Sequence, residues 1–154
     1  MIKKIFLIFI FLFTTSCGYE SIYSKKDQRT IFIDRVIFSG DKKIDRKILS
    51  RLPVQIIKSN ESGLSLNLNS KRKIISASKD SAGNTKVYIL TLTVEISLMK
   101  DEKVIQTKSF ESNFSYNNTS NKFDLNQYQS SIEKNLINII SEKISIYLIS
   151  ENDS

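Results

Sequence analysis

Residues 86–99 have the sequence KVYILTLTVEISLM, in which one row of alternate side chains is wholly apolar. Successive side chains of a β-strand point to opposite faces of the sheet, so this spacing predicts a strand with one face in a core. The other face mixes apolar, hydroxyl and charged side chains, which favours a sheet that is open on that side. The apolar row consists of Tyr88, Leu90, Leu92, Val94, Ile96 and Leu98, and the mixed row of Val87, Ile89, Thr91, Thr93, Glu95 and Ser97.

A second strand is predicted directly after the first. Lys100-Asp101-Glu102 predicts a hairpin turn, and residues 104–116 continue with alternating character. One predicted face carries Val104, Phe110, Phe114 and Tyr116, and the other carries Thr107, Ser109, Glu111, Asn113 and Ser115.

A third strand is predicted upstream, before the turn DSAGN at 80–84. Leu64, Leu66 and Leu68 alternate with polar residues, and strand character resumes at Ile74-Ile75. The apolar phase slips between these two segments, so a bulge near Ser70 is expected. The three strands should form an antiparallel meander.

The segment before them predicts a strand followed by a short helix. Residues 30–38, TIFIDRVIF, are rich in β-branched and aromatic side chains, which favours a strand that ends at Ser39-Gly40. Asp41 is a predicted helix cap, and Pro53 ends the helix or kinks it. The apolar face of this helix consists of Ile44, Ile48, Leu49 and Leu52.

The C-terminal segment predicts one long helix, capped by Asp124 and running to about Ile149. Its apolar residues recur at helical spacing for most of its length. An apolar sheet face must be covered, and two amphipathic helices are available to cover it. We therefore predict a single α+β domain over residues 30–150, a two-layer sandwich with two helices on one face of a mostly antiparallel four-stranded sheet.

The N-terminus has the form of a secretory signal peptide at residues 1–16. Lys3 and Lys4 precede the apolar run IFLIFIFLF at 5–13, which is too short to span a bilayer as a helix. Small residues follow, and then Cys17, the one cysteine of the chain. This order resembles the bacterial lipoprotein signal, although Thr14 stands where an aliphatic residue is usual. The resemblance implies cleavage before Cys17, acylation of its thiol and a lipidated tether at 17–29; a plain secreted protein with an odd thiol is the alternative.

Composition argues against most enzyme chemistry. The chain has no His and no Gly-rich phosphate loop, so common metal, nucleophilic and cofactor sites lose their ligands, and we expect neither a cofactor nor an enzyme. Two carboxylate pairs remain, Asp41 with Asp45 and Glu95 with Glu111. Helix capping explains the first pair better, and solvated strand charges explain the second better.

Basic charge provides one candidate binding site. The formal charge of +7 falls to +5 when the two leader lysines are removed. Lys71, Arg72 and Lys73 form the densest basic cluster and could contact lipopolysaccharide or another phosphate-bearing anion. A charged edge strand that resists aggregation is the favoured alternative. We expect no nucleic-acid partner, because a secreted lipoprotein would not meet one.

Three features resemble the lipopolysaccharide-assembly lipoprotein family, the LptE-like proteins. The mature start, Cys17-Gly18-Tyr19-Glu20-Ser21-Ile22-Tyr23, is similar to a Cys-Gly-Phe/Tyr-x-Pro-Leu-Tyr opening, with Ser21 in place of Pro and Ile22 in place of Leu. The order strand, helix, three strands, helix is similar over the whole mature chain. So is the end of the meander, Phe114-Ser115-Tyr116, followed by a polar loop and a long helix with Tyr128.

This resemblance implies an outer-membrane lipoprotein on the periplasmic side. Such proteins sit inside an LptD-like β-barrel that inserts lipopolysaccharide, help that barrel to assemble, and can bind lipopolysaccharide themselves. A free-standing lipid-binding or envelope-stress lipoprotein is the alternative, and it would need an apolar cavity between sheet and helices. An envelope enzyme would instead need a cleft with convergent carboxylates.

Overall fold

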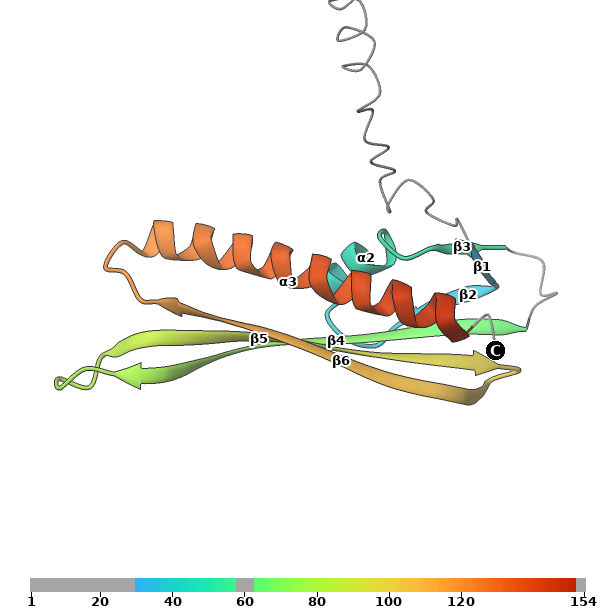
Figure 1. The fold of residues 1–154 in the computed structure, drawn as a ribbon, viewed down its shortest axis with the longest axis horizontal. Helices are drawn as coiled ribbons and strands as arrows, with labels where there is room; N and C mark the ends of the chain where they lie inside the picture. Colours follow the sequence, from blue (N-terminus) through green and yellow to red (C-terminus); the bar gives the residue numbers. More distant parts are fainter. Residues whose placement is uncertain (1–29, 58–62, 152–154) are drawn as a thin grey trace, which may run out of the picture.

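The computed structural model describes residues 30–57 and 63–151 as one two-layer α+β sandwich. A four-stranded sheet has the order β2-β4-β5-β6, in which β2 runs parallel to β4 and the other pairs are antiparallel. Both helices lie on the same face of this sheet (Figure 1). The predicted fold class is confirmed. The elements are β1 (Ile31–Ile33), β2 (Arg35–Phe38), α2 (Lys42–Leu49), β3 (Val54–Ile56), β4 (Leu64–Lys79), β5 (Thr85–Lys100), β6 (Lys103–Asn117) and α3 (Lys122–Glu151).

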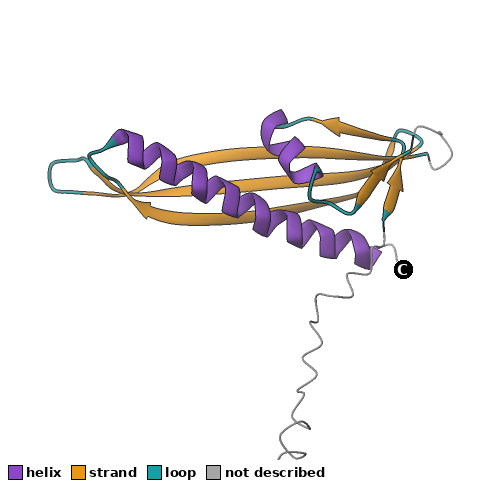
Figure 2. Cartoon of the chain, turned by 90° about the horizontal axis from the view of Figure 1, so that it is seen from above, coloured by secondary structure: helices purple, strands orange, loops and turns teal. Residues whose placement is uncertain are grey.

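The core lies between the sheet and the helices and is centred on β5. Leu90, Leu92 and Val94 are fully buried there, as the alternation predicts. Helix α3 crosses above them along most of the sheet (Figure 2) and contributes side chains such as Ile137 and Ile140, which are also fully buried. These interlocking large side chains fill the space between the layers.

The prediction of one strand over residues 30–38 is wrong, because the chain breaks at Asp34. Ile31 and Ile33 face the core from odd positions, whereas Val36 and Phe38 face it from even positions. A continuous strand would put these two pairs on opposite faces, so the break lets both pack inward. Before the break, β1 lies outside the four-stranded sheet and pairs in parallel with β3. The sequence patterns did not predict this pairing.

A hydrogen bond from β4 to a buried carboxylate joins α2 to β4. The cap at Asp41 is confirmed, since its carboxylate accepts the backbone N–H groups of Lys43 at 2.9 Å and Ile44 at 3.2 Å. Asp45 is fully buried, and its two oxygens accept the backbone N–H groups of Ser70 at 3.0 Å and Gly40 at 3.3 Å. Burial raises the pKa of the Asp45 carboxyl, while these hydrogen bonds oppose the rise.

The bulge expected near Ser70 is also wrong. The pairing of β4 with β5 runs without a shift from Leu64 to Ser76, and the irregularity lies beyond Ser76. Ser70 and Arg72 simply occupy inward positions that apolar residues fill elsewhere in the strand. Ser70 is tolerated there because its hydroxyl donates to the Asp41 carbonyl at 3.2 Å, while its backbone N–H donates to the Asp45 carboxylate.

A register shift does occur where β6 begins. It lies between Leu98 and Met99 of β5 and brings Val104 opposite Met99. The shift moves Val104 out of the inward row, and its side chain is 59% exposed. The prediction that Val104 shares a face with Phe110 is therefore wrong.

Helix α3 begins three residues earlier than predicted and spans 30 residues, or about 45 Å. Its first turn is capped by Asn121, whose side-chain oxygen accepts the N–H groups of Phe123 at 3.0 Å and Asp124 at 3.4 Å. The prediction of Asp124 as the cap is wrong. Asp124 instead accepts a hydrogen bond from the Asn121 amide at 2.7 Å, an arrangement that steadies the cap.

Candidate functional site: the open sheet face

The register brings polar side chains of β4, β5 and β6 together on the sheet face opposite the helices. No described helix or strand covers it (Figure 1). Hydroxyl and amide side chains dominate, as predicted, with two cations on β4 and two carboxylates on β5 and β6. We call this surface the open sheet face; its central residues are Asn67, Asn69, Lys71, Lys73, Thr91, Thr93, Glu95, Ser97, Thr107, Ser109, Glu111, Asn113 and Ser115.

Cross-strand hydrogen bonds organise this surface. Ser97 and Thr107 are register partners, and their hydroxyl oxygens lie 3.0 Å apart. Thr93 donates to the Glu111 carboxylate at 3.2 Å, again across one register pair. Short polar side chains held in this way lose little rotamer entropy when another surface covers them. The open sheet face is therefore suited to contact with a polar partner surface.

Glu95 and Glu111 share the open sheet face, as expected, but they are not register partners. Glu95 lies opposite Ser109, and Glu111 lies opposite Thr93. Both carboxylates are exposed on the sheet surface. Solvated strand charges account for this arrangement.

The predicted basic site does not form a single patch. Lys71 and Lys73 point to the open sheet face, whereas Arg72 points to the helix layer. There its guanidinium lies 3.1 Å from the Glu133 carboxylate of α3, and the same carboxylate accepts from the ammonium group of Lys47 in α2 at 3.2 Å. Arg72 is thus part of an ion pair that joins α2, α3 and β4. Period-two alternation separates neighbouring residues of any strand, so a run of three cations cannot share one face.

Several shallow grooves lie at the rim of the sandwich rather than between its layers. One, of about 340 Å³, runs between α3 and the edge strand β6 and is lined by residues including Phe114, Tyr128, Ile132 and Leu136. Phe114 and Tyr128 are 40% and 49% exposed, which the helical and strand patterns alone did not predict. Beside them, burial raises the pKa of the Tyr116 phenol, whose oxygen accepts from the Gln129 amide at 2.9 Å.

The remaining sequence-based expectations concern the N-terminal segment, metal binding and membrane-spanning helices. The signal peptide, Cys17 and the tether at 17–29 lie outside the described residues. Among residues 30–57 and 63–151, no three His, Cys, Asp or Glu side chains come together in a way that could hold a metal ion. Within the same ranges no helix has both the length and the apolar character needed to cross a membrane.

The fold is shared with several solved lipoproteins. The rare lipoprotein B of Shewanella oneidensis matches with a TM-score of 0.62 at 17% identity, over 77% of this chain and 96% of that one. The minor lipoprotein of Acinetobacter baumannii matches with a TM-score of 0.62 at 13% identity, over 79% and 95%. A lipoprotein from Caulobacter crescentus matches with a TM-score of 0.56 at 12% identity, over 77% and 88%. No protein-family model matches the chain, and no curated protein is similar to it in sequence. At these identities the likeness establishes a common fold.

Proposed function

We propose that this protein is a non-enzymatic outer-membrane lipoprotein, anchored through Cys17 on the periplasmic side, that plugs and helps to assemble the β-barrel translocon that inserts lipopolysaccharide. The open sheet face carries this proposal. The lumen of an outer-membrane barrel is polar, and a domain inside it needs a polar, hydrogen-bonding surface. Thr, Ser and Asn provide such a surface over three adjacent strands.

The N-terminal sequence and the fold support the same proposal. A basic start, a short apolar run and a sole cysteine are typical of a lipoprotein leader. The matched structures are themselves lipoproteins, although their names state neither a barrel partner nor lipopolysaccharide. The mature start and the element order resemble the LptE-like family.

The alternative, a free-standing lipid-binding or envelope-stress lipoprotein, requires room for an acyl chain between the layers. In the described residues that space is occupied by side chains such as Leu68, Leu92, Ile96 and Leu136, which are all 2% exposed or less. The groove beside Phe114 and Tyr128 lies at the rim, where a lipid would remain largely in water. We therefore favour the barrel partner.

Site-specific cross-linking in cells tests the proposal. A photoreactive amino acid at Thr91 or Ser115 places a probe on the open sheet face, and one at Glu142, exposed on α3, is the matched control. We expect the open-face probes to capture a large outer-membrane barrel more efficiently than the control does. We also expect depletion of the protein to impair barrel maturation. If no barrel is captured, and depletion leaves the barrel and lipopolysaccharide export normal, the proposal fails.

A further inference from the structure

One end of the molecule concentrates exposed apolar side chains. β1, β3, the hairpin turn between β5 and β6, and the last turns of α3 all lie there (Figure 1), and we call it the tether end, because the described chain begins there at Thr30. Eleven large hydrophobic side chains are exposed in the described residues, and six belong to these elements or directly follow one. The six are Phe32, Ile56, Ile57, Val104, Ile105 and Ile146.

An ion pair and hydrogen bonds connect segments at this end. Arg35 of β2 pairs with Glu102 of the hairpin at 3.3 Å, and the Asp101 N–H donates to the Gly63 carbonyl at 3.1 Å. The amide of Gln106, near the start of β6, donates to the Glu151 carboxylate at the end of α3 at 2.9 Å. These contacts connect the hairpin and the start of β6 to β2, to Gly63 before β4 and to the end of α3.

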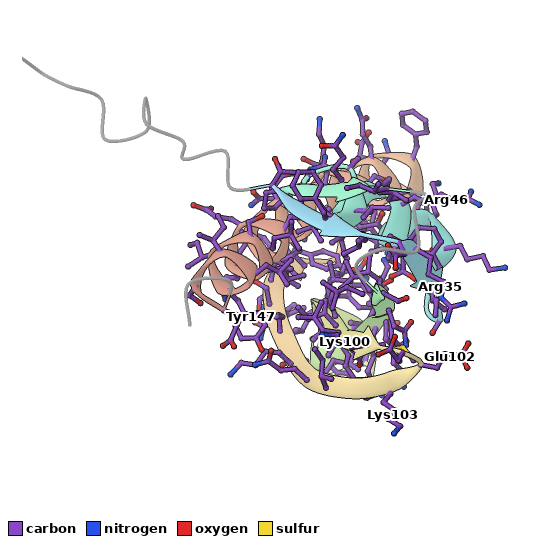
Figure 3. The ribbon with its side chains drawn as sticks, turned by 90° about the vertical axis from the view of Figure 1, so that its right-hand side faces the viewer. Arg35, Arg46, Lys100, Glu102, Lys103 and Tyr147 are labelled. Atoms are coloured by element: carbon purple, nitrogen blue, oxygen red, sulfur yellow. The ribbon has the colours of Figure 1, made fainter. Side chains whose placement is uncertain are left out.

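Charges of both signs surround the apolar side chains. Figure 3 looks onto this end and shows Arg35, Lys100, Glu102 and Lys103 around the hairpin. Asp101 adds a further carboxylate at the turn. Since the two signs nearly cancel here, attraction to a surface of one charge is weak. Apolar contact is the main driving force that this end offers.

The most exposed pair is Val104 and Ile105, at 59% and 57%. They follow the hairpin turn, at the register shift that takes Val104 out of the inward row. Adjacent apolar side chains flanked by Lys100 and Lys103 can enter the boundary between lipid headgroups and acyl chains, as the apolar face of an interfacial helix does. Lysine ammonium groups can remain among the headgroups while their stems lie along the apolar surface.

The chain before Thr30 indicates which surface this end faces. Only twelve residues separate Cys17 from Thr30, so even a fully extended connection spans at most about 45 Å. The opposite end of the molecule lies a further α3 length away, about another 45 Å. A lipid on Cys17 would thus keep the tether end near the bilayer at high effective concentration, and a weak direct contact would suffice to hold it there.

We propose that the tether end lies on the bilayer surface, with Val104 and Ile105 inserted at the headgroup boundary as a contact additional to the acyl anchor. The tether argument rests on the proposed lipoprotein identity, but the contact itself does not require acylation. It would hold the long axis of the domain in a defined direction relative to the membrane.

Vesicle co-sedimentation tests this inference on the chain from residue 17 onward carrying Cys17→Ser, which has no site for acylation. The vesicles are phosphatidylethanolamine with phosphatidylglycerol, at 0.1 M and about 0.5 M salt, so that apolar binding is separated from screened charge attraction. The test variant is V104S/I105S, and the control is I75S/F123S. The control removes two apolar side chains, 43% and 75% exposed, near the end of β4 and at the start of α3, away from the tether end.

We expect the unchanged chain to bind at both salt concentrations, the test variant to partition about tenfold less, and the control to stay within about twofold. Failure of the unchanged chain to bind, or an equal loss in both variants, would overturn the inference. Barrel capture by the open-face probes is measured separately. If capture fails while vesicle binding persists, only the proposed function is wrong.

Discussion

Replacement of Asp45 by Ala should destabilise the domain by about 2–4 kcal/mol. The carboxylate is fully buried and accepts the backbone N–H groups of Ser70 and Gly40. Alanine would leave both donors without this acceptor, at about 1–3 kcal/mol for the buried Ser70 N–H and less for the half-buried Gly40 N–H. Part of this cost is offset, because the variant no longer has to desolvate a carboxylate. Urea unfolding followed by circular dichroism on the Cys17→Ser chain measures the difference in free energy.

The pH dependence of that loss in stability shows whether the ionised Asp45 carboxylate is more or less favourable than its protonated form in the folded domain. Burial raises the pKa of Asp45 above its ordinary value near 3.8. A raised folded-state pKa means that the folded protein holds the proton more tightly, so the stabilising contribution is complete below pH 3.8 and is lost as the pH rises through the folded-state pKa. The penalty of Asp45→Ala should therefore be larger at pH 4 than at pH 7. An equal or larger penalty at pH 7 would show that the hydrogen bonds outweigh burial, and would refute this account.

Three further substitutions test packing and charge by the same unfolding measurement. Gly40→Ala should lower the free energy of unfolding by about 3 kcal/mol, because a Cβ at Gly40 would overlap the backbone nitrogen and oxygen of Ser70. A loss below about 1 kcal/mol would mean that the segments around Gly40 and Ser70 can move apart at little cost. Ser141→Ala should raise stability by about 1 kcal/mol, since the Ser141 hydroxyl is buried and no described residue provides a hydrogen-bond partner; destabilisation would indicate an unseen partner. Glu133→Gln should cost about 0.5–1 kcal/mol through its pairs with Arg72 and Lys47, with a smaller loss in 0.5 M salt; an unchanged loss would point to packing rather than charge.

The sequence was informative wherever one periodicity held without interruption. Alternation through β5 correctly predicted its buried row, the open sheet face and the meander around it. The cap at Asp41 was also predictable, because its hydrogen bonds are local in sequence. These features depend on residues within a few positions of one another, so they are visible without knowledge of the fold.

Three of the wrong predictions share a cause, which is that a residue distant in sequence decided the position. Ser70 looked like a phase slip because its partner, Asp45, is 25 residues away. Arg72 looked like part of a surface cluster because the carboxylate that it meets is on α3. The break at Asp34 follows from the packing of Ile33 and Val36 into one core. No local pattern encodes such long-range compensation.

The placement of charge on the open sheet face constrains how a partner could cover it. The cations Lys71 and Lys73 lie on β4, whereas Glu95 and Glu111 lie on β5 and β6, so the face is polarised across its strands. Burying any of these charged groups without a counter-charge would cost more desolvation free energy than hydrogen bonds from the neighbouring hydroxyls could offset. A barrel wall that covers the whole face should therefore present carboxylates opposite β4 and basic side chains opposite β5 and β6. A wall that lacks this pattern could contact only the hydroxyl-rich rows, such as the pair Ser97 and Thr107. Reversing Lys71 and Lys73 to Glu distinguishes these two arrangements, because only the first loses barrel capture while the fold persists.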